Sequence, residues 1–161
     1  MQKITPFLWF DNQAEAAVNF YTAIFGNSRI LGISRFGEGG PGPSGAVMTV
    51  SFQIEGQNFV ALNGGPVHHF TPAISFAVDC RTQEEVDRLW ESLTADGGEP
   101  GRCAWLTDKY GISWQIVPTR LVELLSDPDP AKSSRVMQAM LTMTRIDIAA
   151  LEAVYAGSCA S

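Results

Sequence analysis

The sequence is poor in positively charged residues and contains no cluster of them. Its 11 Lys and Arg are scattered among 17 Asp and Glu, which gives a formal net charge of −6. Proteins that bind nucleic acid or anionic membranes normally carry a basic patch. We therefore expect neither nucleic acid nor a membrane among the partners of this chain.

Cysteine, histidine and long apolar runs are also scarce. Cys80, Cys103 and Cys159 are odd in number and follow no repeated spacing, which argues against a disulfide framework or a zinc knuckle and fits a reducing compartment. No apolar stretch approaches membrane-spanning length, and the N-terminal residues lack a signal-peptide cleavage site. These features predict a soluble, cytoplasmic protein.

What the chain does have is enough apolar sequence for a well-filled core, since 45% of its 161 residues are hydrophobic and only 17% are charged.

Ile4–Phe10 predicts a strand. Asn12 and Glu15 have the spacing of a capping box for the helix that follows, and Gly26 is suited to its left-handed end. The helix has apolar residues at helical spacing, namely Ala14, Ala17, Val18, Tyr21 and Phe25.

Three strands are predicted after this helix, at Ser28–Phe36, Ala46–Glu55 and Asn58–Leu62. The Gly- and Pro-rich run Gly37–Gly45 predicts a loop, and Gly56-Gln57 predicts a tight hairpin turn. The first half of the chain therefore has the order βαβββ.

The same order returns in the second half. A strand at Pro72–Asp79 precedes a helix that Thr82 and Glu85 cap, with an apolar stripe of Val86, Leu89, Trp90 and Leu93 and an end at Gly97-Gly98. Three further strands are predicted at Pro100–Cys103, Ala104–Thr107 and Ile112–Val117. Thr-Pro pairs open both halves, so we infer an internal duplication, with repeat 1 at 3–65 and repeat 2 at 71–118.

A helical tail is predicted over 119–158. Asp129 followed by Pro130 starts a helix that runs to about Met143, and Asp147 caps a second helix that Gly157 ends. Its methionines at helical spacing favour core packing over a promiscuous binding surface.

Several segments carry a resemblance to a known family, among them TPFLWFD, AVNFY, ALNGGP, AISFAVDC, WLTDKYGISWQIVP and LLSDPDPAKSSRVMQAML. On these the chain resembles the vicinal oxygen chelate superfamily of glyoxalase I, bleomycin-resistance proteins and extradiol dioxygenases, and more narrowly the PhnB-like group, often labelled 3-demethylubiquinone-9 3-methyltransferase. The resemblance implies a single α+β domain over 1–161, in which two βαβββ repeats form curled mixed sheets around a cavity. It also implies a homodimer.

Metal-dependent members of this superfamily carry His, Gln or Glu ligands on the first and last strands of each repeat. The corresponding places fall near Thr5 or Pro6, Ala61 or Asn63, Pro72 or Ala73, and Gln115, and no His or carboxylate stands at any of them. Neutral amides do not offset the dehydration of a dication, so we expect no metal site of this type. His68 and His69 lie in the linker, and neighbouring side chains of an extended segment point in opposite directions.

The methyltransferase label implies S-adenosylmethionine. Binding of this cofactor normally needs a Gly-rich turn between a strand and a helix, whereas Gly37–Gly45 lies between two predicted strands. We therefore expect no cofactor of this kind.

The favoured hypothesis is a small-molecule binding protein, or an enzyme of unknown reaction, with an apolar cavity. The predicted ligand-binding residues are Trp9, Phe7, Phe52, Asn63, Trp105 and Gln115. Amides would orient a ligand and indoles would stack on it, although the same aromatics could simply form the core. The alternatives are a metal-dependent lyase, isomerase or dioxygenase that uses His69, a ubiquinone-pathway methyltransferase, and a drug-sequestering protein that prefers basic ligands.

Overall fold

The computed structural model describes residues 2–157, so Cys159 and the predicted tail end at residue 158 lie outside the described part. The chain divides into two units, Met1–Phe70 and Thr71–Ser161, each with its own sheet. No helix among the described residues is both long and apolar enough to cross a membrane. The α+β class and the two mixed sheets predicted from the sequence are confirmed.

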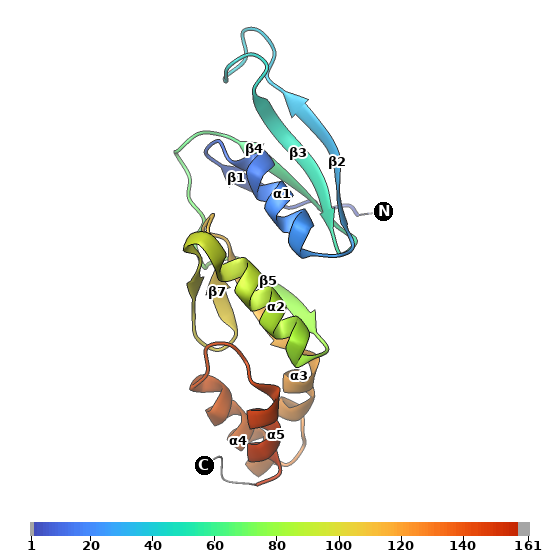
Figure 1. Cartoon of the computed structure of the whole chain (residues 1–161), viewed down its shortest axis with the longest axis vertical. Coiled ribbons are helices and arrows are strands. Elements are labelled where there is room, and N and C mark those ends of the chain that lie inside the picture. Colours follow the sequence, from blue (N-terminus) through green and yellow to red (C-terminus); the bar gives the residue numbers. More distant parts are fainter. Residues whose placement is uncertain (1, 158–161) are drawn as a thin grey trace. The chain divides into compact units, whose positions relative to one another are not determined.

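Unit 1 is a four-stranded sheet with one helix on one face (Figure 1). Its strand order is β1-β4-β3-β2, and only the β1–β4 pair is parallel. The elements follow one another as β1 (Phe7–Phe10), α1 (Ala14–Ile24), β2 (Ser28–Arg35), β3 (Val47–Ile54) and β4 (Gln57–Asn63).

The two faces of this sheet differ in what covers them. Phe52 stacks on Phe59 at a ring-centroid distance of 5.4 Å, and both are buried with the apolar side of α1. Paired residues point to the same face, so Phe7 and Trp9, paired with Val60 and Leu62, lie on the face opposite α1. The unit thus has one covered face and one that its own helix leaves open.

Local details of unit 1 correct three predictions. The backbone N–H of Ala14 donates to Asn63 Oδ1 over 2.9 Å, and α1 has no side-chain cap of its own, so the predicted capping by Asn12 is wrong. Asn63 does this work because β4 ends beside the start of α1. Gly26 does not adopt a positive φ. The hairpin turn is Glu55-Gly56, one residue earlier than predicted, and both residues have positive φ, as a type I′ turn requires.

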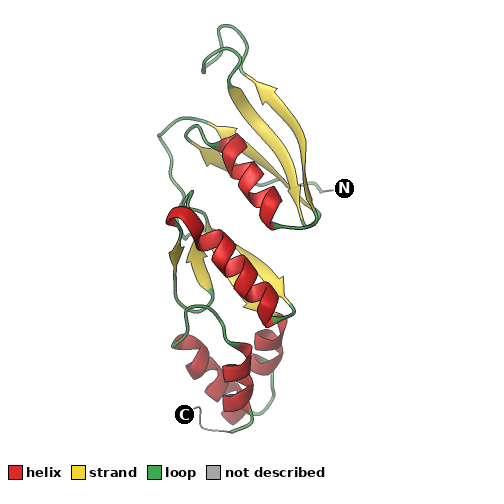
Figure 2. Cartoon of the chain, viewed as in Figure 1, coloured by secondary structure: helices red, strands yellow, loops and turns green. Residues whose placement is uncertain are grey.

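Unit 2 begins with the same order of elements, although the strands that follow its helix are shorter than those of unit 1 (Figure 2). They are β5 (Ser75–Cys80), α2 (Gln83–Thr94), the short 3₁₀ helix η1 (Ala95–Gly97), β6 (Glu99–Pro100), β7 (Trp105–Thr107) and β8 (Ser113–Pro118), with strand order β5-β8-β7-β6. The Thr82 cap is confirmed, because its hydroxyl accepts from the Glu85 N–H. The predicted strand Pro100–Cys103 is wrong: only Pro100 pairs, while Cys103 adopts a positive φ in a turn.

A buried carboxylate organises the turn before β8. Asp108 is 2% exposed, and its Oδ1 accepts from the backbone N–H groups of Tyr110 and Ile112 at 2.8 and 3.1 Å. Its Oδ2 accepts from the indole N–H of Trp114 at 2.9 Å. Gly111 completes the turn with a φ of 93°. One side chain therefore fixes both the turn and the strand that follows it.

Up to residue 157 the tail contains three helices rather than the two predicted, namely α3 (Thr119–Leu125), α4 (Pro130–Leu141) and α5 (Ile148–Tyr155). Asp129 and Asp147 cap α4 and α5 as predicted. The tail packs on the end of the unit 2 sheet through a buried cluster of Ala104, Leu121, Leu124, Val136, Ile146 and Leu151. Met140 and Met143 pack against this cluster, as predicted for core methionines, whereas Met137 is 41% exposed and does not.

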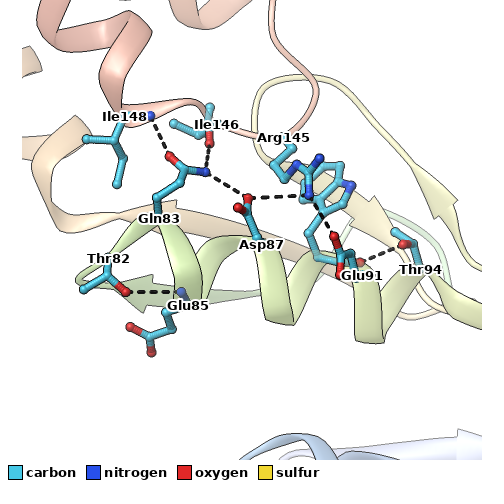
Figure 3. Close-up of polar contacts among 10 residues, drawn as sticks. Thr82, Gln83, Glu85, Asp87, Glu91, Thr94, Arg145, Ile146 and Ile148 are labelled. Atoms are coloured by element: carbon cyan, nitrogen blue, oxygen red, sulfur yellow. Dashed lines mark hydrogen bonds and ion pairs between the residues drawn. The ribbon is translucent and has the colours of Figure 1, made fainter.

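Gln83 links the tail to α2 (Figure 3). Its Nε2 donates to Asp87 Oδ1 at 3.0 Å and to the Ile146 carbonyl at 2.9 Å, while its Oε1 accepts from the Ile148 N–H at 2.8 Å. Arg145 lies 3.5 Å from both Asp87 and Glu91. A single amide thus satisfies backbone groups on both sides of the turn that leads into α5.

Candidate functional site

Trp9 is held firmly on the open face of the unit 1 sheet. Its indole N–H donates to the Gly65 carbonyl at 2.9 Å, and its ring meets the His68 ring edge-on at 4.8 Å between centroids. Gly64 packs so closely against the indole that a Cβ there would lie 2.3 Å from it. This contact explains why glycine follows β4, and it leaves Trp9 little freedom to move.

Trp9 lines a pocket with a volume of about 710 Å³. It lies where β1 and β4 end and α1 begins, and the loop that joins β2 to β3 forms its other side. Its apolar walls include Trp9, Phe36, Val47, Met48 and Leu62, with Pro41 and Pro43 from the loop. Small-molecule sites typically have volumes of ~300–1,000 Å³ and mainly apolar walls, so this pocket has the size and character of one.

Four predicted ligand-binding residues belong to unit 1. Trp9 and Asn63 both line the pocket. Asn63 also has a structural task, since its Oδ1 accepts from Ala14 and its Nδ2 donates to the Val47 carbonyl at 3.1 Å. Phe7 shares the face of Trp9 and is 61% exposed, but it does not line the pocket. Phe52 is 0% exposed and lies in the core under α1.

The other two predicted residues, Trp105 and Gln115, are direct partners on neighbouring strands of unit 2. Both are half-buried on the face opposite α2, and Gln115 Nε2 donates to the Ser75 hydroxyl at 2.9 Å. The structure thus places Trp105 and Gln115 opposite each other on neighbouring strands, whereas Trp9 and Asn63 share only the lining of one pocket.

The residues at the expected metal positions do not form a metal-binding set. Among residues 2–157, no group of three or more His, Cys, Asp and Glu is arranged to hold a metal ion. The one amide oxygen offered by Asn63 already accepts from Ala14. His68 and His69 are both exposed, and His68 packs on Trp9 without lining the pocket. The donors present do not fit the metal site that the superfamily resemblance implies.

Cys80 does not offer an activated thiol. Burial raises the pKa of the Cys80 thiol to about 12, with the neighbouring Glu85 and Asp79 carboxylates adding to the effect. A thiol with such a pKa stays protonated at neutral pH and is a poor nucleophile. Cys80 is therefore a core residue of unit 2.

Some pocket residues were not predicted from the sequence. Asp11 and Glu15 line the pocket beside the start of α1, and Phe36 flanks it from the end of β2. The capping-box spacing predicts a structural role for Glu15 and therefore does not indicate it as a site residue. The available signal was position, since Asp11 follows β1 directly and the ends of strands are frequent ligand sites.

Comparisons with known proteins agree with this architecture. Residues 2–117 match a family model described as 3-demethylubiquinone-9 3-methyltransferase. A PhnB protein from Bacillus cereus, whose description carries the same methyltransferase name, is 42% identical, with 73% of this chain and 100% of that one covered and a TM-score of 0.66. A protein from Pseudomonas aeruginosa is 19% identical, with coverage of 73% and 98% and a TM-score of 0.60. No curated protein matches significantly.

The family match stops at Val117, one residue before β8 ends, and so does not include α3. The tail segments on which the sequence resemblance also rested therefore lie outside it. The pocket of unit 1 and the Trp105–Gln115 pair both lie inside it.

Proposed function

Because this chain belongs to the PhnB-like family, whose model is described as 3-demethylubiquinone-9 3-methyltransferase, we propose that it binds a small organic molecule in the unit 1 pocket without the metal site of its superfamily. One observation carries the proposal: a pocket of about 710 Å³ with mostly apolar walls is built around an indole that is held in place. We propose, in addition, a cytoplasmic homodimer, as the sequence and the family resemblance suggest.

The ligand in this proposal has a flat, apolar body. The Trp9 indole N–H is already bonded to Gly65, so the ring offers its π face and edges rather than a donor. Such rings favour planar or aromatic partners in offset or edge-on contact. Pro41, Pro43 and Phe36 add further apolar lining for such a body.

We expect Trp9→Ala to weaken the binding of 1-naphthalenemethanol, a neutral probe with a flat apolar body, by about tenfold, because it removes the main aromatic wall. Equilibrium dialysis of the wild type and the variant measures the effect. Trp105→Ala is the control, since Trp105 belongs to unit 2 and does not line the pocket. A loss in Trp105→Ala with none in Trp9→Ala would place the site elsewhere.

The metal-dependent alternative makes the opposite prediction about metal content. We expect protein purified after growth in metal-replete medium to hold less than about a tenth of an equivalent of any transition ion, because the described donors do not form a metal-binding set. Elemental analysis decides this point. One equivalent of a single metal would favour a lyase, isomerase or dioxygenase instead.

The methyltransferase name of the family is not the basis of this proposal. The Gly-rich run Gly37–Gly45 joins β2 to β3, so it does not lead into a helix as a cofactor-binding turn does. The start of α1 follows Asp11, Asn12 and Gln13 instead. These residues do not fit S-adenosylmethionine in the way its usual binding fold requires.

A further inference from the structure

The ionisable side chains that line the unit 1 pocket are all acidic. They are Asp11, in the turn after β1, and Glu15, in the first turn of α1, and no Lys, Arg or His of the described chain lines the pocket. Glu15 is half-buried and Asp11 is exposed. A negative charge held against apolar walls is screened less than one on an open surface, so the pocket favours a positively charged ligand.

These carboxylates are not neutralised by the described part of the chain. Neither Asp11 nor Glu15 takes part in any of the ion pairs found among residues 2–157. At the start of α1 the Ala14 N–H is already bonded to Asn63, which leaves one fewer donor for an anionic ligand. The charge at this end of unit 1 therefore remains available to a ligand.

The aromatic wall points to the same ligand class. With its N–H occupied by Gly65, Trp9 presents a ring whose electron-rich face attracts cations, and Phe36 adds a second ring to the lining. Carboxylates and aromatic faces together recognise ammonium groups. An anionic ligand would meet repulsion from both.

We propose that the ligand of this pocket carries a protonated amine on a flat, apolar body, with the ammonium beside Glu15 and Asp11 and the body against Trp9 and Leu62. This inference rests on the proposed function, which supplies the pocket, and adds the chemical class of the ligand. Binding of such a ligand involves no covalent bond to the protein.

Three probes with one naphthalene body test the inference: 1-naphthylmethylamine, 1-naphthalenemethanol and 1-naphthoate. We expect the amine to bind about threefold to tenfold more tightly than the alcohol, and the carboxylate to bind more weakly than both. Raising the salt concentration should reduce the advantage of the amine and leave the alcohol unchanged. Equilibrium dialysis at low and high salt measures these ratios.

Glu15→Gln should reduce the amine-to-alcohol affinity ratio to less than half of the wild-type value, and circular dichroism of the variant checks that it is folded. Glu84→Gln is the matched control, because Glu84 lies in the first turn of α2 and does not line the pocket. Equal affinities for amine and alcohol in the wild type, or an unchanged ratio in Glu15→Gln, would overturn the inference but leave the proposed function standing. Binding of none of the three probes would overturn both.

Discussion

Replacing Asp108 with Asn is expected to lower the free energy of unfolding by about 3 kcal/mol, although it changes only one group of the side chain. The remaining amide oxygen can still accept from the Tyr110 and Ile112 N–H groups. The new NH₂ group then faces the Trp114 indole N–H, so two donors meet where Oδ2 accepted at 2.9 Å. With Asp108 only 2% exposed, water has little access to satisfy either donor.

Urea denaturation of Asp108→Asn, Trp114→Phe and the double variant tests this explanation. Trp114→Phe removes the indole donor, so adding Asp108→Asn to it should cost at least about 1 kcal/mol less than adding it to the wild type. Asp79→Asn, at an exposed position of β5, serves as the control and should change stability by less than about 0.5 kcal/mol. Additive costs in the double variant would show that the Asp108–Trp114 bond is not the reason.

Gln83→Glu should destabilise the chain by about 2 kcal/mol, because both groups that accept from its Nε2 would then face a carboxylate oxygen. These groups are Asp87 Oδ1 and the Ile146 carbonyl, at 3.0 and 2.9 Å. The contact with the Ile148 N–H can persist, since Glu keeps an acceptor there. The damage should therefore concentrate on the turn that leads into α5.

Hydrogen exchange locates that damage, because faster exchange of amides in α4 and α5 than in β5 and β8 is the expected pattern. Arg145→Ala is the comparison variant. It removes only the ion pairs to Asp87 and Glu91, whose side chains are largely solvated, and should cost less than about 1 kcal/mol. If Arg145→Ala proves more damaging than Gln83→Glu, the ion pairs and not the amide hold the tail.

The order of elements was predictable because its signals are local. The apolar stripe Val86–Leu93 and the Thr82 cap lie within one helix, and the Asp129-Pro130 start of α4 lies within two residues. The predictions were wrong where a residue distant in the sequence makes the contact that a local pattern had indicated. Asn63 caps α1 from 49 positions away, which no pattern around Asn12 could reveal. The short helix α3 was missed because it lacks a side-chain cap and spans only seven residues.

The candidate site was only partly predictable for the same reason. An aromatic residue on a predicted strand can belong either to the core or to a cavity wall, and only the strand register distinguishes the two. Phe52 faces α1, while Trp9 faces the opposite side of the sheet. The capping-box pattern predicts that the Glu15 carboxylate bonds back to the backbone N–H of Asn12. In the structure Asn63 accepts from the Ala14 N–H at the start of α1, and Glu15 lines the pocket.

The parallel pairing of the first and last strands in each unit has a consequence for the order of folding. Phe7 pairs with Val60 and Ser75 with Ser113, so the first strand of each unit can join its sheet only after the last strand has been synthesised. Each of these pairings joins residues that are far apart in the sequence. During synthesis, all strands of unit 1 are present once Asn63 has been added. Unit 2 must wait longer, because Cys103 and Ala104 donate to the carbonyls of Met143 and Thr144 in the tail. During translation, unit 1 can therefore complete its sheet early, whereas unit 2 depends on the segment between α4 and α5.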